Sequence, residues 1–570
     1  MTRRDWIIRC LVWLALAIVL LFPASISPSE LLVGHPDVDV WNHAWGYWFV
    51  PKALAEFSLP VSTDLIAPQG GALYFIDMLG ALLGTPLSWL AGAAVAYNGV
   101  LILRVAAAGL AAHCLTEALT GKGAHSWVAG AAYASAPYLL SELHNGITEV
   151  ASVHWIAWVL LMAQRIRSGS TPATRAQWCW LGVAQGLCTA ANFYYGLVSA
   201  MMVAIVLGWD GVSRLRAKVR LQIDWASIGV ALGLALVIAL PFWGAFQWSL
   251  MTDTAIVVRP SEVASTWMLE HNAVDVRTFF MPGDFQSVDL AAKGEAFLHT
   301  GYLRWTLLTL AVWGVLSDRR LRPWALAGLV SAVIGLGPFL WWGEHIMVGG
   351  RHVSLPFYWL QLVLPDVAIT HTLRLAVGAQ LMGAVLGAAG LAALARRKQV
   401  LASAGAAALV GGLIVAEGLF ASPAPWPIAT SNTAIPSAMS NLGRGPILDL
   451  PGSVGATMAT SRYFWFQTAH GKPVPWTPNV RLDSCRDLDV QGAFTNPRAR
   501  AQTHQVVEDP ASGPDFLQKS LLQRYSAIVL HTDLVERADL PSSYAKTLTK
   551  VLGPPQTEGD LLIWYGEGAP

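Results

Sequence analysis

Long apolar segments separated by short polar connections dominate the first 420 residues of the chain. Runs of about 20 apolar residues recur, the length that an α-helix needs to cross the hydrocarbon core of a bilayer. The pattern predicts an α-helical polytopic membrane protein with about eleven transmembrane helices. We expect these helices near residues 8–27, 95–119, 126–142, 150–166, 176–192, 194–210, 225–245, 302–317, 322–341, 371–395 and 400–420.

The N-terminal run resembles a signal peptide, but its length and the many runs that follow favour an uncleaved first helix. Only 13% of the 570 residues are charged and 54% are apolar, whereas soluble proteins carry about 25% charged residues. A net charge of +1 gives no indication of nucleic-acid binding. Four of the five cysteines fall in predicted membrane helices, so we expect no disulfide framework.

Basic residues predict the orientation in the membrane. The connections on one side of the predicted topology carry the clusters Arg3/Arg4/Arg9, Lys122, Arg165/Arg167/Arg175, Arg214/Arg216/Lys218/Arg220, Arg319/Arg320/Arg322 and Arg396/Arg397/Lys398. Basic loops stay in the cytoplasm, which places the N-terminus there. An odd number of crossings puts the C-terminal tail outside, in the periplasm of a Gram-negative cell. We therefore expect a multi-pass protein of the bacterial inner (cytoplasmic) membrane.

Two further boundaries follow from composition. A long first outer loop covers residues 28–94, and its apolar segment 72–92 is either re-entrant and interfacial or a further span. We favour the interfacial alternative, because a further span would divide the basic clusters between both sides.

The chain changes character at the linker "ASPAPWPIATSNTAIP", residues 421–436. We expect strands within "GPILDLPG", "RYSAIVLHTDLV" and "DLLIWYGE", and a helix within "SSYAKTLTKVLG". The prediction is a membrane region, residues 1–420, followed by a small extracytoplasmic α/β domain, residues 421–570.

The stretch "GHPDVDVWNHAWGYWF" carries polar groups directly after the first apolar run. In an extended segment Asp37 and Asp39 point to the same side. Such a pair can hold a divalent cation such as Mg²⁺ or Mn²⁺, or one carboxylate can act as a general base. Asp-x-Asp is common by chance, however, and the plainer interpretation is that both residues cap the following helix and face water.

A second polar cluster, "SELHNGITEV", lies at the predicted outer turn between the third and fourth spans. It contains Glu142, His144, Asn145 and Glu149. These side chains either meet solvent in an ordinary polar loop or face the first-loop aspartates across a cavity. Ionisable groups near membrane depth are costly, which makes a functional role the working hypothesis.

Arginines near the outer face are candidates for phosphate binding, because a guanidinium can donate two parallel hydrogen bonds to a phosphate. Arg374 opens the tenth predicted span, with His371 one turn earlier, and Arg259 lies in an outer loop. The alternative for Arg374 is snorkelling to the interface. Arg104, inside the second span, is more typical of an intramembrane ion pair.

These features together resemble the C-type (GT-C) glycosyltransferase superfamily. The resemblance is carried by the acidic first outer loop, by the outer tail and by the order of the pieces "PDVDVWNHAWGYWF", "APQGG", "AYNG", "LHNGITE", "LPDVAITHTLRLAVGAQL", "ILDLPG" and "RYFWFQTAHGKPV". Asp37 and Asp39 match the acidic positions that these enzymes place at the start of the first outer loop. Asp39 is the favoured catalytic residue because it is closest to the predicted interfacial helix.

The resemblance implies an activity. Such enzymes take a sugar from a polyprenyl-phosphate donor in the membrane lipid and pass it to an extracytoplasmic glycan, lipid or protein. Arg374 or Arg259 would bind the phosphate, and His144, Asn145, Glu149 and His371 would contribute to the substrate site. Any metal would be held by Asp37 and Asp39.

Two other functions remain open at this point. A transporter or flippase for lipid-linked glycans would use the same arginines, but it predicts polar groups at mid-membrane depth and access from both sides. The polar groups here cluster at the outer edge, which favours the enzyme. A non-catalytic assembly protein for envelope glycans is the second alternative, and it predicts that the aspartates are dispensable.

Overall fold

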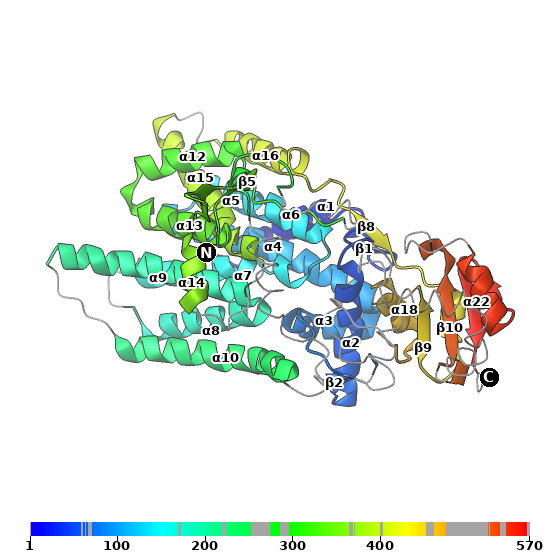
Figure 1. Cartoon of the computed structure of the whole chain (residues 1–570). Helices are drawn as coiled ribbons and strands as arrows, with labels where there is room; N and C mark the ends of the chain where they lie inside the picture. Colours follow the sequence, from blue (N-terminus) through cyan, green and yellow to red (C-terminus); the bar gives the residue numbers. More distant parts are fainter. Residues whose placement is uncertain are drawn as a thin grey trace.

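A computed structural model gives the structure of the protein. It describes residues 2–58, 61–62, 64–65, 71–168, 173–218, 224–251, 274–285, 296–363, 369, 371–398, 403–451, 461–474, 522–523, 525–535 and 543–566. Helices make up most of the molecule, and a small sheet lies at the end opposite to α9 and α10 (Figure 1).

The α-helices of the first 420 residues are α1 (Arg3–Leu20), α2 (Val40–Glu56), α3 (Met78–Ala91), α4 (Ala93–Thr120), α5 (His125–Ala134), α6 (Pro137–His144), α7 (His154–Arg167), α8 (Arg175–Ala191), α9 (Phe193–Arg216), α10 (Trp225–Met251), α12 (Trp305–Ser317), α13 (Arg322–Gly335), α14 (Pro356–Val363), α15 (Val377–Arg397) and α16 (Ala404–Phe420). Short 3-10 helices include η1 (Glu149–Ala151), η2 (Val276–Phe279), η4 (Arg319–Leu321) and η5 (Thr372–Ala376). The described loops between the helices contribute very short strands, which form four antiparallel pairs. The pairs are β1 (Leu31–Val33) with β8 (Thr430–Asn432), β2 (Val61–Ser62) with β3 (Gly71–Ala72), β4 (Trp341–Trp342) with β5 (Glu344–His345), and β6 (Met347–Val348) with β7 (Arg351–His352).

Four described helical segments are long and apolar enough to cross a membrane: Ala93–Thr120, Phe193–Ser213, Trp225–Ser249 and Thr372–Arg397. Three shorter apolar helices, α3, α12 and α16, accompany them. The count of eleven crossings stays a prediction, as does the orientation. α1 is not one of these apolar helices, because its sequence contains three arginines and an aspartate.

The predicted span 126–142 is interrupted. The structure divides it into α5 and α6 at Ser135 and Ala136, directly before Pro137. Proline lacks a backbone N–H and clashes with the preceding turn, so it begins a new helix more readily than it continues one.

Helix α15 lies at the centre of the helical region and packs against α4, α5, α12 and α13. Nearly all of the Thr372–Arg397 segment is buried, whereas the Trp225–Ser249 segment is 6% buried and presents its apolar side chains outward. Such an exposed apolar surface on a long helix is what contact with lipid requires.

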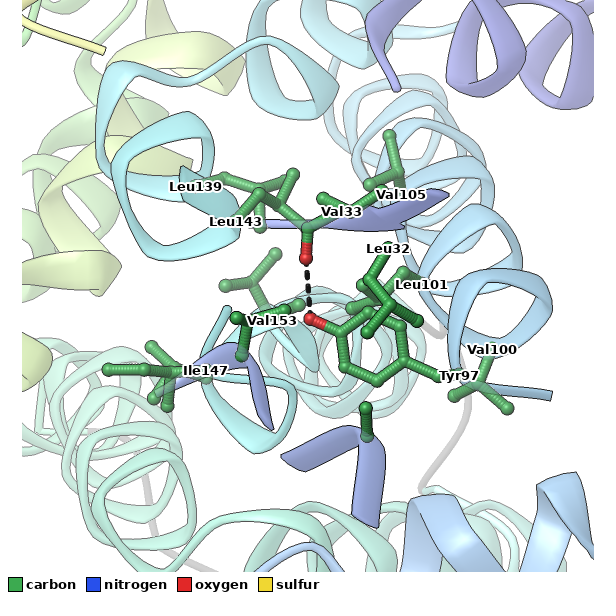
Figure 2. Close-up of a cluster of buried hydrophobic side chains, with 14 of the residues drawn as sticks. Leu32, Val33, Tyr97, Val100, Leu101, Val105, Leu139, Leu143, Ile147 and Val153 are labelled. Atoms are coloured by element: carbon green, nitrogen blue, oxygen red, sulfur yellow. Dashed lines mark hydrogen bonds between the residues drawn. The ribbon is translucent and has the colours of Figure 1, made fainter. Parts of the chain in front are cut away.

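The first loop returns to the helices at β1. Leu32 and Val33 are fully buried, and the Tyr97 hydroxyl on α4 donates a 2.6 Å hydrogen bond to the Val33 carbonyl (Figure 2). The partner of β1 is β8, which falls in the segment predicted to be a linker. That prediction was wrong for these residues, because the two strands pair across about 400 positions of sequence.

The tail contains a four-stranded sheet of order β11-β12-β10-β9. Its strands are β9 (Ile447–Leu450), β10 (Ala527–His531), β11 (Gln556–Glu558) and β12 (Leu561–Tyr565), and its helices are α18 (Arg462–His470) and α22 (Tyr544–Leu552). β10 is parallel to β9 and antiparallel to β12. The three strands and the helix expected in this part of the chain coincide with β9, β10, β12 and α22. The division into two domains stays a prediction.

The tail packs on the first loop. Helix α18 lies against α2 (Figure 1), and the Trp45 indole Nε1 donates a 2.8 Å hydrogen bond to Oε1 of Gln467. The Gln467 amide in turn donates to the backbone carbonyl of Asp64. The position of α2 is therefore fixed partly by residues more than 400 positions later.

Candidate functional site

Asp39 occupies the N-cap position of α2, but its side chain makes no capping hydrogen bond to the helix backbone. The carboxylate instead accepts a long hydrogen bond, 3.4 Å, from the Asn42 amide. Helix capping is therefore not the role of Asp39. The residue is half-buried. Burial raises the pKa of the Asp39 carboxyl above its ordinary value, although nearby His43 and Arg374 oppose this shift.

Asp37 lies in a different environment. Its carboxylate Oδ2 is 4.0 Å from Nδ1 of His35, and about a quarter of its side chain is exposed. The backbone between Pro36 and Asp39 forms a turn, so the extended segment that would point both aspartates to one side is not formed. Proline is favoured near the start of turns, which explains the difference.

The second polar cluster lies directly beside this turn. Gly146 adopts a φ of +69°, and a Cβ at this position would stand 2.6 Å from the Cα of Val40. Only glycine permits both that conformation and that approach without strain. The Asn-Gly of "LHNGITE" therefore brings the Glu149 segment against the first turn of α2, next to Asp39.

Glu149 lies between α2 and η5. Its Oε1 is 3.5 Å from Nη1 of Arg374, and its Oε2 is 3.7 Å from Nδ1 of His43. Only 3% of the Glu149 side chain is exposed. Burial raises the pKa of this carboxyl, with His43 and Arg374 acting in the opposite direction. Arg374 also stacks over the Tyr194 ring, with its guanidinium carbon 5.5 Å from the ring centroid.

A third carboxylate belongs to the same group. Glu142 interacts electrostatically with both Asp39 and Arg374. Its Oε1 is 3.4 Å from Nδ1 of His299, while its Oε2 is buried with no hydrogen-bond partner in the described part of the chain. Asp39, Glu142, Glu149 and Arg374, together with His43 and His299, form what we call the outer polar cluster.

His144 and Asn145 have other contacts. The Asn145 amide donates to the Leu298 carbonyl at 2.7 Å and accepts from the Leu298 N–H at 2.8 Å. His144 Nε2 lies 3.0 Å from the carbonyl oxygen of Ala296, and burial lowers the pKa of this imidazole to about 4, which keeps it neutral. Both side chains hold the segment 296–298 beside the cluster through hydrogen bonds. That they also contact the substrate stays a prediction.

Two of the predicted site residues remain, His371 and Arg259. His371 precedes η5, and its backbone N–H donates to the Tyr194 hydroxyl at 3.3 Å. It therefore lies near Arg374, as its spacing indicated. Arg259 falls outside the described residues.

Arg104 forms the ion pair that its position favoured. Its guanidinium donates to both oxygens of Asp77, at 2.8 and 2.7 Å, and to the carbonyl of Thr148. Burial opposes the charged form of Asp77, but Arg104 outweighs it and lowers the pKa of this carboxyl. The Thr148 hydroxyl lies 2.9 Å from Nδ1 of His43. The Arg104–Asp77 pair therefore helps to hold the backbone at Thr148, the residue directly before Glu149. Asp77 and His43 had no assigned role in the sequence.

A divalent cation finds little support in the geometry. Within the described ranges, no group of three or more His, Cys, Asp or Glu side chains is arranged to hold a metal ion. Asp37 and Asp39 alone supply two carboxylates, fewer ligands than Mg²⁺ or Ca²⁺ sites usually collect from protein and water. A metal requirement stays a prediction, and no step below depends on it.

Models of known protein families give no match to this sequence, and curated proteins give none. Solved structures do match. The arabinofuranosyltransferase AftD from Mycobacteria is similar over the whole chain, with 18% identity and a TM-score of 0.57, and a variant of it gives 0.60. The chain spans about two fifths of the AftD chain, 40–42%. The Archaeoglobus fulgidus oligosaccharyltransferase shows 12% identity and a TM-score of 0.49, covering 95% of this chain and 71% of its own.

The AftD comparison establishes the fold. The protein has a GT-C-like fold, as the sequence resemblance indicated. The long apolar helices agree with the membrane location that this fold implies.

Proposed function

We propose that the protein is a membrane glycosyltransferase that transfers a sugar from a polyprenyl-phosphate donor to an extracytoplasmic glycan, lipid or protein. The observation that carries the proposal is the outer polar cluster in a GT-C-like fold. It combines a half-buried aspartate that makes no capping bond, Asp39, with a half-buried arginine, Arg374, in electrostatic interaction with it. A base and a phosphate-binding cation are the two groups that this reaction needs.

The mechanism follows from the two groups. Asp39 accepts the proton of the acceptor hydroxyl while the hydroxyl oxygen attacks C1 of the sugar. The bond between C1 and the phosphate oxygen breaks, and polyprenyl phosphate leaves with the electron pair. Arg374 stabilises the negative charge that develops on the phosphate. Attack from the face opposite to the leaving group inverts the configuration at C1.

Burial of Asp39 suits this role. A general base works best when its pKa lies near the operating pH, and an exposed aspartate is too weak a base. Burial raises the pKa of Asp39 in that direction, against the opposing effect of His43 and Arg374. The interaction of Asp39 with Arg374 favours it over Asp37, whose carboxylate is near His35.

The matched pair Asp39→Asn and Asp37→Asn tests the assignment. Each amide keeps the shape of the side chain and removes its charge. In a deletion strain of the source organism, we expect Asp37→Asn to restore the envelope glycan, measured by linkage analysis. Asp39→Asn should lower transfer by about 10²–10⁴-fold, the usual contribution of a general base.

Protein amount and thermal melting of the purified variants provide the control. If Asp39→Asn is folded and restores the glycan fully, the catalytic proposal is wrong. A transport or assembly role, which does not need this carboxylate, would then explain the protein.

A further inference from the structure

The ion pair between Glu149 and Arg374 is unusually loose. Its shortest separation is 3.5 Å, whereas charge-assisted hydrogen bonds to carboxylates are about 2.7–2.9 Å long. The Arg104–Asp77 pair of the same region reaches 2.7 Å and is bidentate. Arg374 is therefore held near Glu149 without being fully satisfied by it.

Glu149 itself is incompletely paired. Its Oε2 is buried and has no hydrogen-bond partner among the residues that the structure describes, and His43 approaches this oxygen only to 3.7 Å. Among the described residues, the groups that interact electrostatically with Glu149 include His43 on α2, Asp77 before α3, Arg104 on α4, Tyr138 on α6 and Arg374 on η5, with Asp39 and Glu142 in the same cluster. Because Asp77 engages Arg104 on both oxygens, Arg374 is the described cation that balances Glu149.

We propose that Glu149 is a positioning residue that holds Arg374 in the empty site, and that Glu149 takes up a proton when the phosphate group of the lipid donor replaces it on Arg374. This inference rests on the proposed function and adds a proton to the donor-binding step. Charge is conserved: the donor phosphate gains Arg374, and the carboxylate that loses Arg374 becomes a neutral acid.

The physical reason is the cost of an isolated buried charge. A carboxylate that loses its cation in a dry environment shifts its pKa upward and becomes protonated rather than remaining charged. The incoming phosphate adds a second negative charge nearby, which favours the neutral acid further. Burial already raises the pKa of Glu149 while Arg374 is present.

A defined pH dependence follows. Binding takes up a proton wherever Glu149 is ionised in the free protein and protonated in the complex. Between these two pKa values, affinity falls as pH rises, by at most tenfold per pH unit for one proton.

Isothermal titration calorimetry tests the proposal directly. The full-length protein in detergent is titrated with farnesyl methyl phosphate, a phosphodiester that does not itself titrate near neutral pH. We use two buffers of different ionisation enthalpy at one pH, across a pH series. Proton uptake appears as a difference in apparent binding enthalpy between the buffers, and it needs no variant. We expect uptake of up to one proton, with affinity falling as pH rises.

Three variants locate the proton. Glu149→Gln should bind the phosphodiester without proton uptake and with no pH dependence. Glu142→Gln, the matched control on the neighbouring carboxylate, should retain the uptake, as should His43→Gln. Loss of the uptake in His43→Gln would assign the proton to the imidazole and overturn the proposal.

Two other results separate this inference from the proposed function. If the unmodified protein binds the phosphodiester without proton uptake, the role of Glu149 is wrong and the glycosyltransferase proposal stands. If it does not bind, or if Arg374→Gln binds equally well, the phosphate-binding role of Arg374 fails, and this inference fails with it.

Discussion

Replacing Arg104 by methionine removes the cation that balances Asp77 and leaves the rest of the side-chain volume nearly unchanged. Asp77 is fully buried, and Arg104 is 5% exposed. After the substitution Asp77 retains hydrogen bonds from the Tyr47 hydroxyl and the Gly80 N–H, at 2.9 and 3.2 Å. Its negative charge, however, then has no cation at hydrogen-bonding distance among the described residues.

The magnitude follows from this arrangement. Removing one partner of a buried ion pair typically lowers the free energy of unfolding by about 3–5 kcal/mol, because the other charge remains buried. Arg104→Met also removes the donor to the Thr148 carbonyl. We therefore expect a loss near the upper end of this range, and a smaller loss for the double variant Arg104→Met/Asp77→Asn, in which no charge is left behind.

The pH dependence gives a second signature. In the native protein Arg104 lowers the pKa of Asp77, so the pair contributes stability above the unfolded pKa of Asp77 and loses it as pH falls through the lowered value. Without Arg104, burial raises the pKa of Asp77 instead. Arg104→Met should therefore become more stable as pH falls from 7 toward about 4, the usual aspartate value, whereas the native protein should not.

The assay is unfolding in mixed micelles followed by tryptophan fluorescence, with 26 tryptophans as the probe. The four proteins of the double-variant cycle are compared across a pH series. Equal stability of Arg104→Met and the native protein would refute the reasoning. So would a double variant as unstable as Arg104→Met, because the cost would then not come from the stranded charge.

Two further predictions follow from the site. Transfer activity should fall on acidification with a midpoint above about 4, the ordinary aspartate pKa. The reason is that burial raises the pKa of Asp39 and that only its ionised form accepts a proton. A pH–rate profile whose acidic limb lies at or below that value would contradict the general-base role. Asn145→Ala should lower the free energy of unfolding by about 1–3 kcal/mol, the usual penalty for hydrogen bonds left unmade. It should also increase proteolysis near residue 298, whose backbone N–H and C=O both pair with this amide. Unchanged cleavage would contradict the role of Asn145 in holding this segment.

Sequence reasoning reached the helical membrane architecture because long apolar runs have few alternative structures. It also singled out Asp39, Glu149 and Arg374, since polar groups at the ends of such runs are costly. Their proximity could be given only as one of two alternatives, because 110 and 225 positions separate consecutive members and no local pattern encodes a contact at that distance.

Other features left weaker signals. The proline itself signals the helix break before Pro137, but the continuous apolar run around it predicts an unbroken span. β8 was read as part of a linker because three residues rich in hydroxyl and amide groups resemble a turn. Asp77 was visible as a polar residue in an apolar segment, yet nothing local named Arg104 as its partner.

The contact between Trp45 and Gln467 also bears on when the protein becomes functional. These residues are 422 positions apart, and synthesis at roughly 5–20 residues per second separates them by on the order of tens of seconds. During that interval α2 lacks both α18 and the β8 strand that anchors its approach. The geometry around Asp39 is therefore completed only by the last quarter of the chain, so a truncated product would carry every residue of the outer polar cluster without the support that arranges it.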